Sequence, residues 1–434
     1  MKYYSTKNPA VKVSEEIAVL KGLPEDNGLF VPEEIPLLDD NFFKNIEKWS
    51  FQEISFEVAK IFFDSIDEKE LKNIIYDAIN FDAPVVNIDN NIFTLELFHG
   101  PTLAFKDFGA RFMSRVMSYF INKYNKKLVI LVATSGDTGS AVANGFYGID
   151  NIDVIILYPS KKISNIQEKQ IATLDKNIIA LEIDGTFDDC QYLVKTAFLD
   201  SHLNTKIMLS SANSINVARL IPQSFYYFYA YSQLQNKDNV YISVPSGNFG
   251  NLTAGLFAKR MGLPVKKFVA STNANSVFTE YLNTGEYRPR PSIKTISNAM
   301  DVGNPSNFER IKWLYKDNIN AVREDIVSYS FSDDETKIAI KEVFGKSGYI
   351  LDPHGAVGYL GLINFFEEVV QDNKTGIFLE TAHPAKFLDI VEPVINSKVD
   401  VPKRLGKFLN KEKRALKLSN KFDDLKNYLL NVYG

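Results

Sequence analysis

The feature that most constrains the fold of this chain is a repeated pattern. In each repeat, a short run of apolar residues ends in a loop, and a helix-like stretch follows. It is seen in KLVILVATSGDTGSAVANGFYG, DVIILYPS, NVYISVPSGNFGNLTAGLFAKRMG and KTGIFLETAHPAKFLDI. Alternating strands and helices of this kind predict open α/β sheets, in which ligands bind where strands lead into helices. We therefore expect the functional residues in these loops.

The first part of the chain differs from this pattern. Ser14 begins SEEIAVLKGL, which predicts a helix with acidic residues at its positive N-terminus and an end at Gly22 and Pro24. FQEISFEVAKIFFDSI and DEKELKNIIYDAI have apolar residues at helical spacing. We predict a mainly helical N-terminal extension over residues 1–92. The α/β region then covers 93–434 and divides into two subdomains, roughly 93–220 and 221–434.

Composition excludes several classes of protein. Of the 434 residues, 45% are hydrophobic and 24% are charged, as in ordinary soluble proteins. No apolar run approaches the roughly 18 residues that span a bilayer, and the start, MKYYSTKNPAVKVSEE, has no apolar signal core. The net charge of −4 gives no general attraction to nucleic acid. We expect a cytoplasmic protein that binds neither membranes nor nucleic acid.

Residues that could bind a metal ion are scarce and scattered. Cys190 is the only cysteine, so an internal disulfide and a multi-cysteine metal site are excluded. The histidines, His99, His202, His354 and His383, show no HExxH-type spacing. We expect no metal, so the chemistry must come from other groups.

Lys106 is the first candidate, in the segment FHGPTLAFKD over Phe98–Asp107. A lysine among apolar neighbours loses solvation, which disfavours its charged form and makes a reactive amine. Taken alone, Lys106 is more easily explained as a solvated or snorkelling side chain, which is the usual fate of lysine.

Two glycine loops support a function for this lysine. Ser246, Gly247, Asn248, Phe249, Gly250 and Asn251 lie between a β-branched run and a helix, where backbone N–H groups and the helix N-terminus suit an anion. TSGDTGSAVA, at Thr134–Ala143, has the same layout with more hydroxyl groups. Neither loop matches the GxGxxG or GxxxxGK[ST] nucleotide motifs, and each alone is equally explained by tight turns.

Together, these features meet the requirements of pyridoxal 5'-phosphate. That cofactor needs an amine for a Schiff base, a neutral cradle for its phosphate and a site for the substrate carboxylate. It also needs a partner for its ring nitrogen, and Thr381, after the apolar strand GIFLE, could supply a hydroxyl. On this segment alone, a hydroxyl satisfied by the backbone is the simpler reading of Thr381.

Six ordered motifs resemble threonine synthases of the branch with an N-terminal extension. They are HGPTLAFKDFGARF, ATSGDTGSAVA, SSANSINVARLIPQ, SGNFGN, SNAMDVGNPSNFER and ETAHPAKF, and the opening YYSTKNPAVKVS with GLPEDNGLFVPEEIP is also similar. The resemblance covers essentially the whole chain. It implies the tryptophan-synthase-β-like fold of pyridoxal-phosphate enzymes, with residues 93–434 as the catalytic region. The implied reaction is the last step of threonine biosynthesis: γ-elimination of phosphate from O-phospho-L-homoserine and β-addition of water, giving L-threonine.

The resemblance also implies roles for matching residues. Lys106 would form the Schiff base and then move protons during the reaction. Ser246–Asn251 would hold the cofactor phosphate, and Thr381 would meet the ring nitrogen. The loop formed by Thr134, Ser135, Gly136, Asp137 and Thr138 would take the substrate carboxylate. Asn213, Ser214 and Arg219 would grip the substrate phosphate, because a guanidinium matches phosphate oxygens; by itself, Arg219 could equally form a surface ion pair.

Asp137 is a departure from related enzymes, which have asparagine beside the phenolic oxygen of the cofactor. A carboxylate there would repel that oxygen unless it is protonated or turned away. His99 is expected to orient the lysine loop, to touch substrate or to be a structural histidine. The remaining motif residues are expected to line the site without transferring protons: Met300, Asp301, Asn307, Asp352 and His354.

Two other functions remain open on the sequence. One is another enzyme of the same fold, such as a serine or threonine dehydratase or a cysteine-forming sulfhydrylase. The expected second anion-binding segment, SANSINVAR, disfavours it, because the usual substrates of those enzymes do not need it as a γ-phosphate site. The other is a catalytically idle relative that binds pyridoxal phosphate or a phosphorylated ligand, which the presence of Lys106, Gly247, Asn248 and Thr381 disfavours. The resemblance allows either a monomer or a homodimer.

Overall fold

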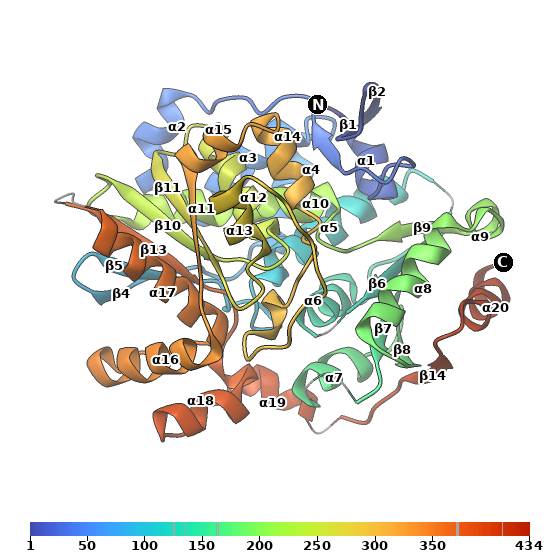
Figure 1. Cartoon of the computed structure of the whole chain (residues 1–434). Helices are drawn as coiled ribbons and strands as arrows, with labels where there is room; N and C mark the ends of the chain where they lie inside the picture. Colours follow the sequence, from blue (N-terminus) through green and yellow to red (C-terminus); the bar gives the residue numbers. More distant parts are fainter. Residues whose placement is uncertain (125, 135, 162, 164, 370–372, 410) are drawn as a thin grey trace.

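The computed structural model describes residues 1–124, 126–134, 136–161, 163, 165–369, 373–409 and 411–434. Two β-sheets lie side by side, and the N-terminal helices cover one end of the molecule (Figure 1). Ser135 falls outside the described residues, so its predicted role stays a prediction.

The larger sheet has six strands in the order β12-β11-β10-β13-β5-β4, all parallel except the antiparallel β4–β5 pair. In chain order they are β4 (Val85–Asp89), β5 (Ile92–Glu96), β10 (Val240–Pro245), β11 (Val265–Thr272), β12 (Ile326–Ser330) and β13 (Thr375–Glu380). In β11, Phe268 and Ala270 join one hydrophobic core, whereas Val269 between them joins another. The strand is therefore buried on both faces, which explains its continuous apolar sequence.

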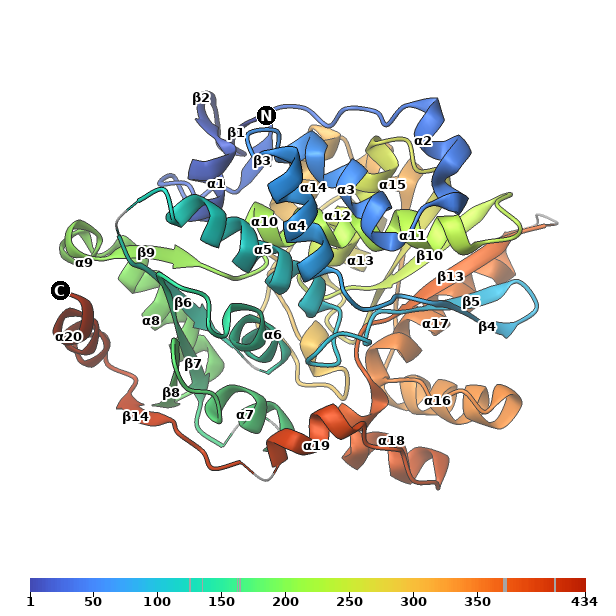
Figure 2. The same cartoon turned by 180° about the vertical axis from the view of Figure 1, so that it is seen from behind.

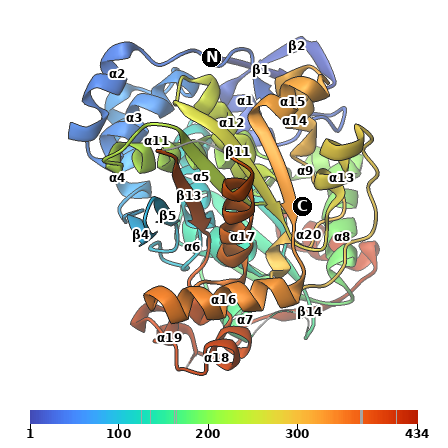
Figure 3. The ribbon, with the colours of Figure 1, turned by 60° about the vertical axis from the view of Figure 1, so that its left-hand side comes forward.

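Helices cover both faces of this sheet. Helix α17 (Pro353–Glu368) lies along one face, as seen from the side in Figure 3. A Cβ added at Gly361 of α17 would come within 1.9 Å of Ser271 Oγ in β11, so glycine permits this close packing. On the other face, Gly255 of α12 (Gly250–Arg260) packs against Phe268. The sheet is thus held rigidly where β10 leads into α12.

The smaller sheet has five parallel strands in the order β14-β8-β7-β6-β9. They are β6 (Leu128–Ala133), β7 (Ile152–Pro159), β8 (Ile178–Asp184), β9 (Met208–Ser211) and β14 (Leu416–Ser419). The last strand comes from the end of the chain, and α20 (Phe422–Tyr433) then packs against α8 (Phe187–Leu199), as Figure 2 shows from behind. This sheet therefore contains a segment from outside the predicted subdomain of roughly 93–220.

The N-terminal part contains a small sheet that the sequence pattern did not indicate. Strands β1 (Lys2–Ser5), β2 (Asn8–Ser14) and β3 (Phe30–Pro32) form an antiparallel sheet in the order β2-β1-β3. The predicted helix after Ser14 is confirmed as α1 (Glu15–Lys21), with Ser14 as its N-cap and Gly22 at its left-handed end. The two further helices are also confirmed, as α3 (Phe51–Phe62) and α4 (Glu68–Ala78).

Other helices connect these elements. They are α2 (Asp40–Asn45), α5 (Lys106–Ile121), α6 (Asp137–Phe146), α7 (Asn165–Ala172), α9 (Ser201–Lys206), α10 (Val217–Leu220), α11 (Phe225–Gln233), α13 (Val277–Thr284), α14 (Phe308–Tyr315), α15 (Ile319–Asp325), α16 (Asp333–Ser347), α18 (Leu388–Ile395) and α19 (Lys403–Leu409). Short 3-10 turns are η1 (Ile46–Lys48), η2 (Ile221–Ser224), η3 (Asn298–Met300) and η4 (Pro384–Lys386). Across the described ranges, no helix is both long and apolar enough to cross a bilayer.

Arg310 ties the N-terminal part to the rest of the molecule. Its side chain is fully buried, and its guanidinium donates to the carbonyl oxygens of Phe30 at 3.0 Å and Ile215 at 2.5 Å. It also donates to Asn307 Oδ1 at 2.6 Å. Burial lowers the pKa of Arg310 to about 9, which reflects the cost of enclosing this charge. The hydrogen bonds must offset that cost.

We predict that Arg310→Ala lowers the free energy of unfolding by about 3 kcal/mol or more, because it leaves buried carbonyl groups unpaired and opens a cavity. Urea denaturation followed by circular dichroism measures this. The control is Arg288→Ala. The Arg288 side chain is 74% exposed in an ion pair with Glu286, so its removal should change the free energy of unfolding by less than about 0.5 kcal/mol. Equal effects of the two substitutions would contradict the prediction.

Candidate active site

Lys106 is the first residue of α5 and follows a turn that its neighbour Asp107 fixes. The buried Asp107 carboxylate accepts hydrogen bonds from the Thr102 backbone N–H at 2.8 Å and the Thr102 hydroxyl at 2.7 Å. A Cβ on Gly100 would lie 2.4 Å from Asp107 Oδ2, so the turn needs glycine there. The position of Lys106 at the start of the helix is therefore set by close contacts.

The surroundings of Lys106 favour a neutral amine. Burial lowers the pKa of the Lys106 amine to about 8; the Asp137 carboxylate opposes this shift, and the charges of Arg219 and Lys386 add to it. The Lys106 ammonium nitrogen lies 5.7 Å from the centre of the Phe105 ring. A lysine with this pKa is available as a nucleophile and base near neutral pH.

Thr381 lies beside the lysine turn. It follows β13, and its carbonyl oxygen accepts a hydrogen bond from the Phe105 N–H at 2.9 Å. Ala104 and Ala382 form an antiparallel bridge, and the His383 N–H donates to the Leu103 carbonyl at 3.0 Å. The segment after β13 is thus paired to the turn that carries Lys106.

The predicted phosphate loop connects β10 to α12. Phe249 has φ of 59°, the left-handed conformation, and α12 begins at the next residue, Gly250. A Cβ on Gly247 would lie 2.6 Å from Met300 Cα, so the loop backbone passes close to η3. The Ser246 hydroxyl donates to the Val244 carbonyl at 2.8 Å. The first residues of α12 include neither Asp nor Glu. The helix N-terminus is therefore suited to an anion.

Two asparagines of this loop have different surroundings. Asn248 Nδ2 donates to Ser214 Oγ at 2.7 Å, which joins this loop to the SANSINVAR segment. Asn251 faces the interior, because its Oδ1 accepts from the hydroxyls of Tyr226 and Tyr227, each at 2.6 Å. The Asn251 Oδ1 is thus engaged by the two tyrosines, whereas its buried Nδ2 has no hydrogen-bond partner among the described residues.

The Thr134–Thr138 segment leads from β6 into α6. Thr134 Oγ1 accepts hydrogen bonds from the N–H groups of Gly136 at 3.0 Å and Gly139 at 2.8 Å. Gly136 has φ of 147°, and a Cβ there would clash with Gln167 at 2.4 Å. Asp137 and Thr138 lie in the first turn of α6 rather than in a free loop. The Thr134 hydroxyl also donates to the Gly136 carbonyl at 3.1 Å, so it stabilises the turn, and the α6 N-terminus is the feature of this segment that suits a carboxylate.

Asp137 forms an ion pair that the sequence analysis did not identify. Its Oδ1 lies 2.6 Å from Lys386 Nζ and accepts from Gln167 Nε2 at 3.0 Å. Burial alone would raise the pKa of Asp137, but the charges of Lys386 and Lys106 outweigh it and hold this pKa below its usual value. Asp137 is therefore ionised and turned toward Lys386. The apolar neighbours of Lys386 in PAKF are the same signal that singled out Lys106.

Arg219 is buried in α10 rather than lying on the surface. Its Nη1 donates to the Ala212 carbonyl at 2.6 Å, and its Nε has no hydrogen-bond partner in the described part of the chain. Burial lowers its pKa to about 10, against the opposing charge of Asp107. Asn213 and Ser214 are half-buried on the segment that precedes α10. A buried guanidinium with a free donor is suited to an anionic ligand.

A buried chain of polar groups also reaches the site from α17. Asp352 caps α17, and its Oδ1 lies 2.5 Å from His354 Nδ1. His354 Nε2 accepts from the Ala299 N–H at 3.2 Å, next to the Met300 that contacts the phosphate loop. Asp352 and His354 therefore connect the start of α17 to the backbone of η3, which packs against the phosphate loop. Asp301 instead bonds to Thr295 and Asn273, away from Lys106.

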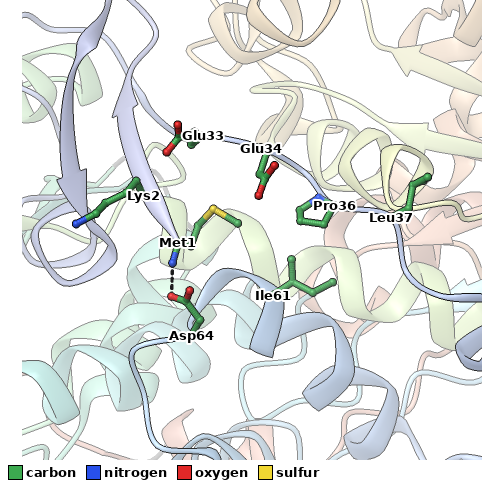
Figure 4. Close-up of a pocket in the computed structure, with 8 residues that line it drawn as sticks. All are labelled: Met1, Lys2, Glu33, Glu34, Pro36, Leu37, Ile61 and Asp64. Atoms are coloured by element: carbon green, nitrogen blue, oxygen red, sulfur yellow. Dashed lines mark hydrogen bonds and ion pairs between the residues drawn. The ribbon is translucent and has the colours of Figure 1, made fainter.

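Of two cavities in the described structure, one lies close to these elements. One of about 450 Å³ is lined by Met1, Lys2, Glu33, Glu34, Pro36, Leu37, Ile61 and Asp64, and Figure 4 shows the ion pair of Met1 with Asp64 at its edge. None of the candidate site residues lines it. The other, of about 520 Å³, is lined by Pro101, Asn144, Arg404, Lys407, Phe408 and Lys411. It lies beside the lysine turn, because Pro101 belongs to that turn and Arg404 donates to the His99 carbonyl at 2.6 Å.

Family models match nearly the whole chain. "Threonine synthase N terminus" matches residues 2–79, "Pyridoxal-phosphate dependent enzyme" matches 82–379, and "Threonine synthase, C-terminal" matches 356–429. Among curated proteins, threonine synthase of Haemophilus influenzae is 45% identical over 433 residues, covering 99% of this chain and 100% of that protein.

Solved structures agree with these matches. The crystal structure of threonine synthase from Escherichia coli has a TM-score of 0.92 and 41% identity, with 100% of both chains covered. The pyridoxal-phosphate-bound threonine synthase from Brucella melitensis has a TM-score of 0.94 and 34% identity, covering 100% of this chain and 99% of that one. The chain belongs to the threonine synthase family of pyridoxal-phosphate-dependent enzymes.

Proposed function

We propose that this chain converts O-phospho-L-homoserine and water to L-threonine and phosphate. The observation that best supports this reaction is the 2.7 Å hydrogen bond between Asn248 and Ser214. It joins two loops that each suit an anion, beside the buried Arg219. The reaction needs two such places, one for the phosphate of the cofactor and one for that of the substrate.

The residues fit pyridoxal phosphate. The close approach of Gly247 to Met300 and the start of α12 give a cradle of backbone N–H groups, as a phosphate requires. Lys106 would bind the cofactor covalently, and the Thr381 hydroxyl would meet its ring nitrogen. When bound, this cofactor supplies an electron sink that stabilises negative charge at the substrate Cα and then at Cβ.

The substrate would be held at both ends. Arg219, Asn213 and Ser214 would bind the substrate phosphate, with the free Nε of Arg219 as one donor. The Thr134–Thr138 segment, including Ser135, would bind the carboxylate. The positive cavity lined by Arg404, Lys407 and Lys411 beside the lysine turn would attract such a doubly anionic substrate.

Lys106 would move the protons of the reaction. Its amine takes a proton from Cα, and a second proton then leaves Cβ so that phosphate can depart from Cγ. A proton added at Cγ then completes the methyl group, water adds its hydroxyl group at Cβ and gives its other proton to the departed phosphate, and Lys106 returns a proton to Cα. Its pKa of about 8 suits both acceptance and return near neutral pH. A closed site would exclude water until phosphate has left, because early protonation would give a keto acid instead.

The same proposal includes the location and organisation of the protein. We expect it to act in the cytoplasm as a monomer or homodimer. Residues 1–92 would serve as an extension to a catalytic region at 93–434, although β4 and β5 pair across the proposed boundary.

The test is an assay of the purified chain with pyridoxal phosphate and O-phospho-L-homoserine. We expect phosphate and threonine in equal amounts. L-Serine and O-acetyl-L-serine serve as alternative substrates for a dehydratase and a sulfhydrylase. Turnover of either in preference to phosphohomoserine would overturn the proposal, as would bound cofactor without any turnover.

We predict that Lys106→Ala abolishes both the visible absorbance of the bound cofactor and threonine formation, because it removes the amine that forms the Schiff base, while Lys386 is held in its ion pair with Asp137. Borohydride reduction of the unsubstituted enzyme followed by peptide mapping should find the cofactor on Lys106. The peptide that contains the buried Lys386 serves as an internal control, because we expect it to carry no cofactor. Cofactor on the Lys386 peptide, or near-normal turnover of Lys106→Ala, would contradict the assignment.

We predict that Arg219→Ala lowers kcat/KM for phosphohomoserine by about a hundredfold or more, which corresponds to ~2.7 kcal/mol, because it removes the charged donor to the substrate phosphate. Inhibition by inorganic phosphate should weaken in parallel. Arg414→Ala, at a side chain 64% exposed, is the control for loss of an arginine. Unchanged phosphate inhibition in Arg219→Ala would argue against this role.

A further inference from the structure

Asp137 poses an electrostatic problem for a site that depends on the Lys106 amine. Its carboxylate is buried, ionised and near enough to Lys106 to favour the charged form of that lysine. A direct ion pair between them would keep Lys106 protonated, and a protonated amine is neither a nucleophile nor a base.

Lys386 binds this carboxylate instead. Its side chain is 0% exposed, and its ammonium group lies 2.6 Å from Asp137 Oδ1 and 3.1 Å from the Thr102 carbonyl oxygen. Thr102 is also the residue that Asp107 fixes in the lysine turn. One buried ammonium group therefore connects the segment after Thr381, the lysine turn and the start of α6.

The backbone holds Lys386 in place. It ends η4, and its own N–H donates to the His383 carbonyl at 3.0 Å. His383 is in turn bonded to the Leu103 carbonyl of the lysine turn. The Lys106 nitrogen, by contrast, is affected by burial and by neighbouring charges, with no hydrogen bond from a described residue among the influences on its pKa.

We propose that Lys386 is a positioning residue of the active site, whose ammonium group holds the Asp137 carboxylate away from Lys106 and so leaves the Lys106 amine free. This inference rests on the proposed function of Lys106. It also accounts for a carboxylate at a position near the cofactor, because the pair of Asp137 with Lys386 carries no net charge.

The groups that face Lys106 define the expected electrostatic effects. They are Asp137 at the start of α6, Arg219 of α10 and Lys386 of η4, with Asp107 next to Lys106 in α5. Removing Lys386 takes away a positive neighbour and frees the Asp137 carboxylate, so the pKa of Lys106 should rise. Removing the charge of Asp137 takes away the negative neighbour, so this pKa should fall.

The experiment compares Lys386→Met, Asp137→Asn and the double variant with the unsubstituted holoenzyme. The readout is the pH midpoint of the visible absorbance of bound pyridoxal phosphate, without substrate; in this state the Lys106 nitrogen would be part of the Schiff base, and the same neighbouring charges would act on its protonation. We expect Lys386→Met to raise the midpoint and Asp137→Asn to lower it, each by about one unit or more, and the double variant to return close to the starting value. Lys386→Arg, which keeps the charge, should stay closest to the unsubstituted enzyme.

A purely structural ion pair would give a different result. It would shift the midpoints of the two single variants in the same direction or not at all, and either of these results overturns the proposal, whereas a lower melting temperature is expected in both cases. If Lys386→Met does not fold, the downward shift in Asp137→Asn and the return in the double variant remain decisive. Melting curves by circular dichroism establish that each variant is folded.

A second readout separates this inference from the proposed function. The rate at which acetic anhydride modifies Lys106 in the cofactor-free full chain, followed by mass spectrometry over a pH series, reports the pKa of the amine directly. The opposite shifts in the two single variants should also appear there. If they do while phosphohomoserine is not turned over, the role of Lys386 stands and the proposed reaction fails.

Discussion

The site depends on the pairing between the turn before Lys106 and the chain that follows β13. Phe105 bonds to the Thr381 carbonyl, and Ala104 bridges to Ala382, so two segments far apart in sequence form one backbone unit. This unit fixes the first residue of α5 relative to the end of a central strand of the larger sheet. Because backbone hydrogen bonds in a buried region are costly to leave unmade, the distance between Lys106 and Thr381 is set by the fold rather than by flexible side chains.

The same unit brings buried charges together, and their balance gives Lys106 its chemistry. Lys106, Lys386 and Arg219 are three cationic groups in one region, with Asp137 and Asp107 as the neighbouring carboxylates. Enclosing charges in protein is expensive unless they are paired. Asp137 is paired with Lys386 and Asp107 with the Thr102 donors. The lysine expected to carry the cofactor thus has a pKa of about 8, because burial and the charges of Arg219 and Lys386 outweigh the Asp137 carboxylate.

The two glycine segments both need glycine because other parts of the chain pack closely against their backbone. Gly247 and Gly136 both lie where a side chain would collide with a neighbouring segment, η3 in one case and Gln167 in the other. Each precedes a helix N-terminus, where the first backbone N–H groups have no partner within the helix. Asn251 illustrates the limit of reading such a loop from sequence, because its side chain is held by two tyrosine hydroxyls and only the structure shows this.

The sequence by itself determined the α/β class, the strand-to-helix loops and the family, because continuous apolar runs and glycine motifs are local features that burial on both faces of a sheet requires. It did not indicate the N-terminal sheet, since the strand Asn8–Ser14 is mostly exposed and lacks an apolar pattern. Nor did it show that β14 joins the smaller sheet or that Lys386 meets Asp137. Those contacts join residues distant along the chain, and only tertiary packing decides which buried charges become neighbours. The motifs therefore identified Lys106 as the candidate residue, whereas the inference that its amine is left free depends on contacts that only the folded chain shows.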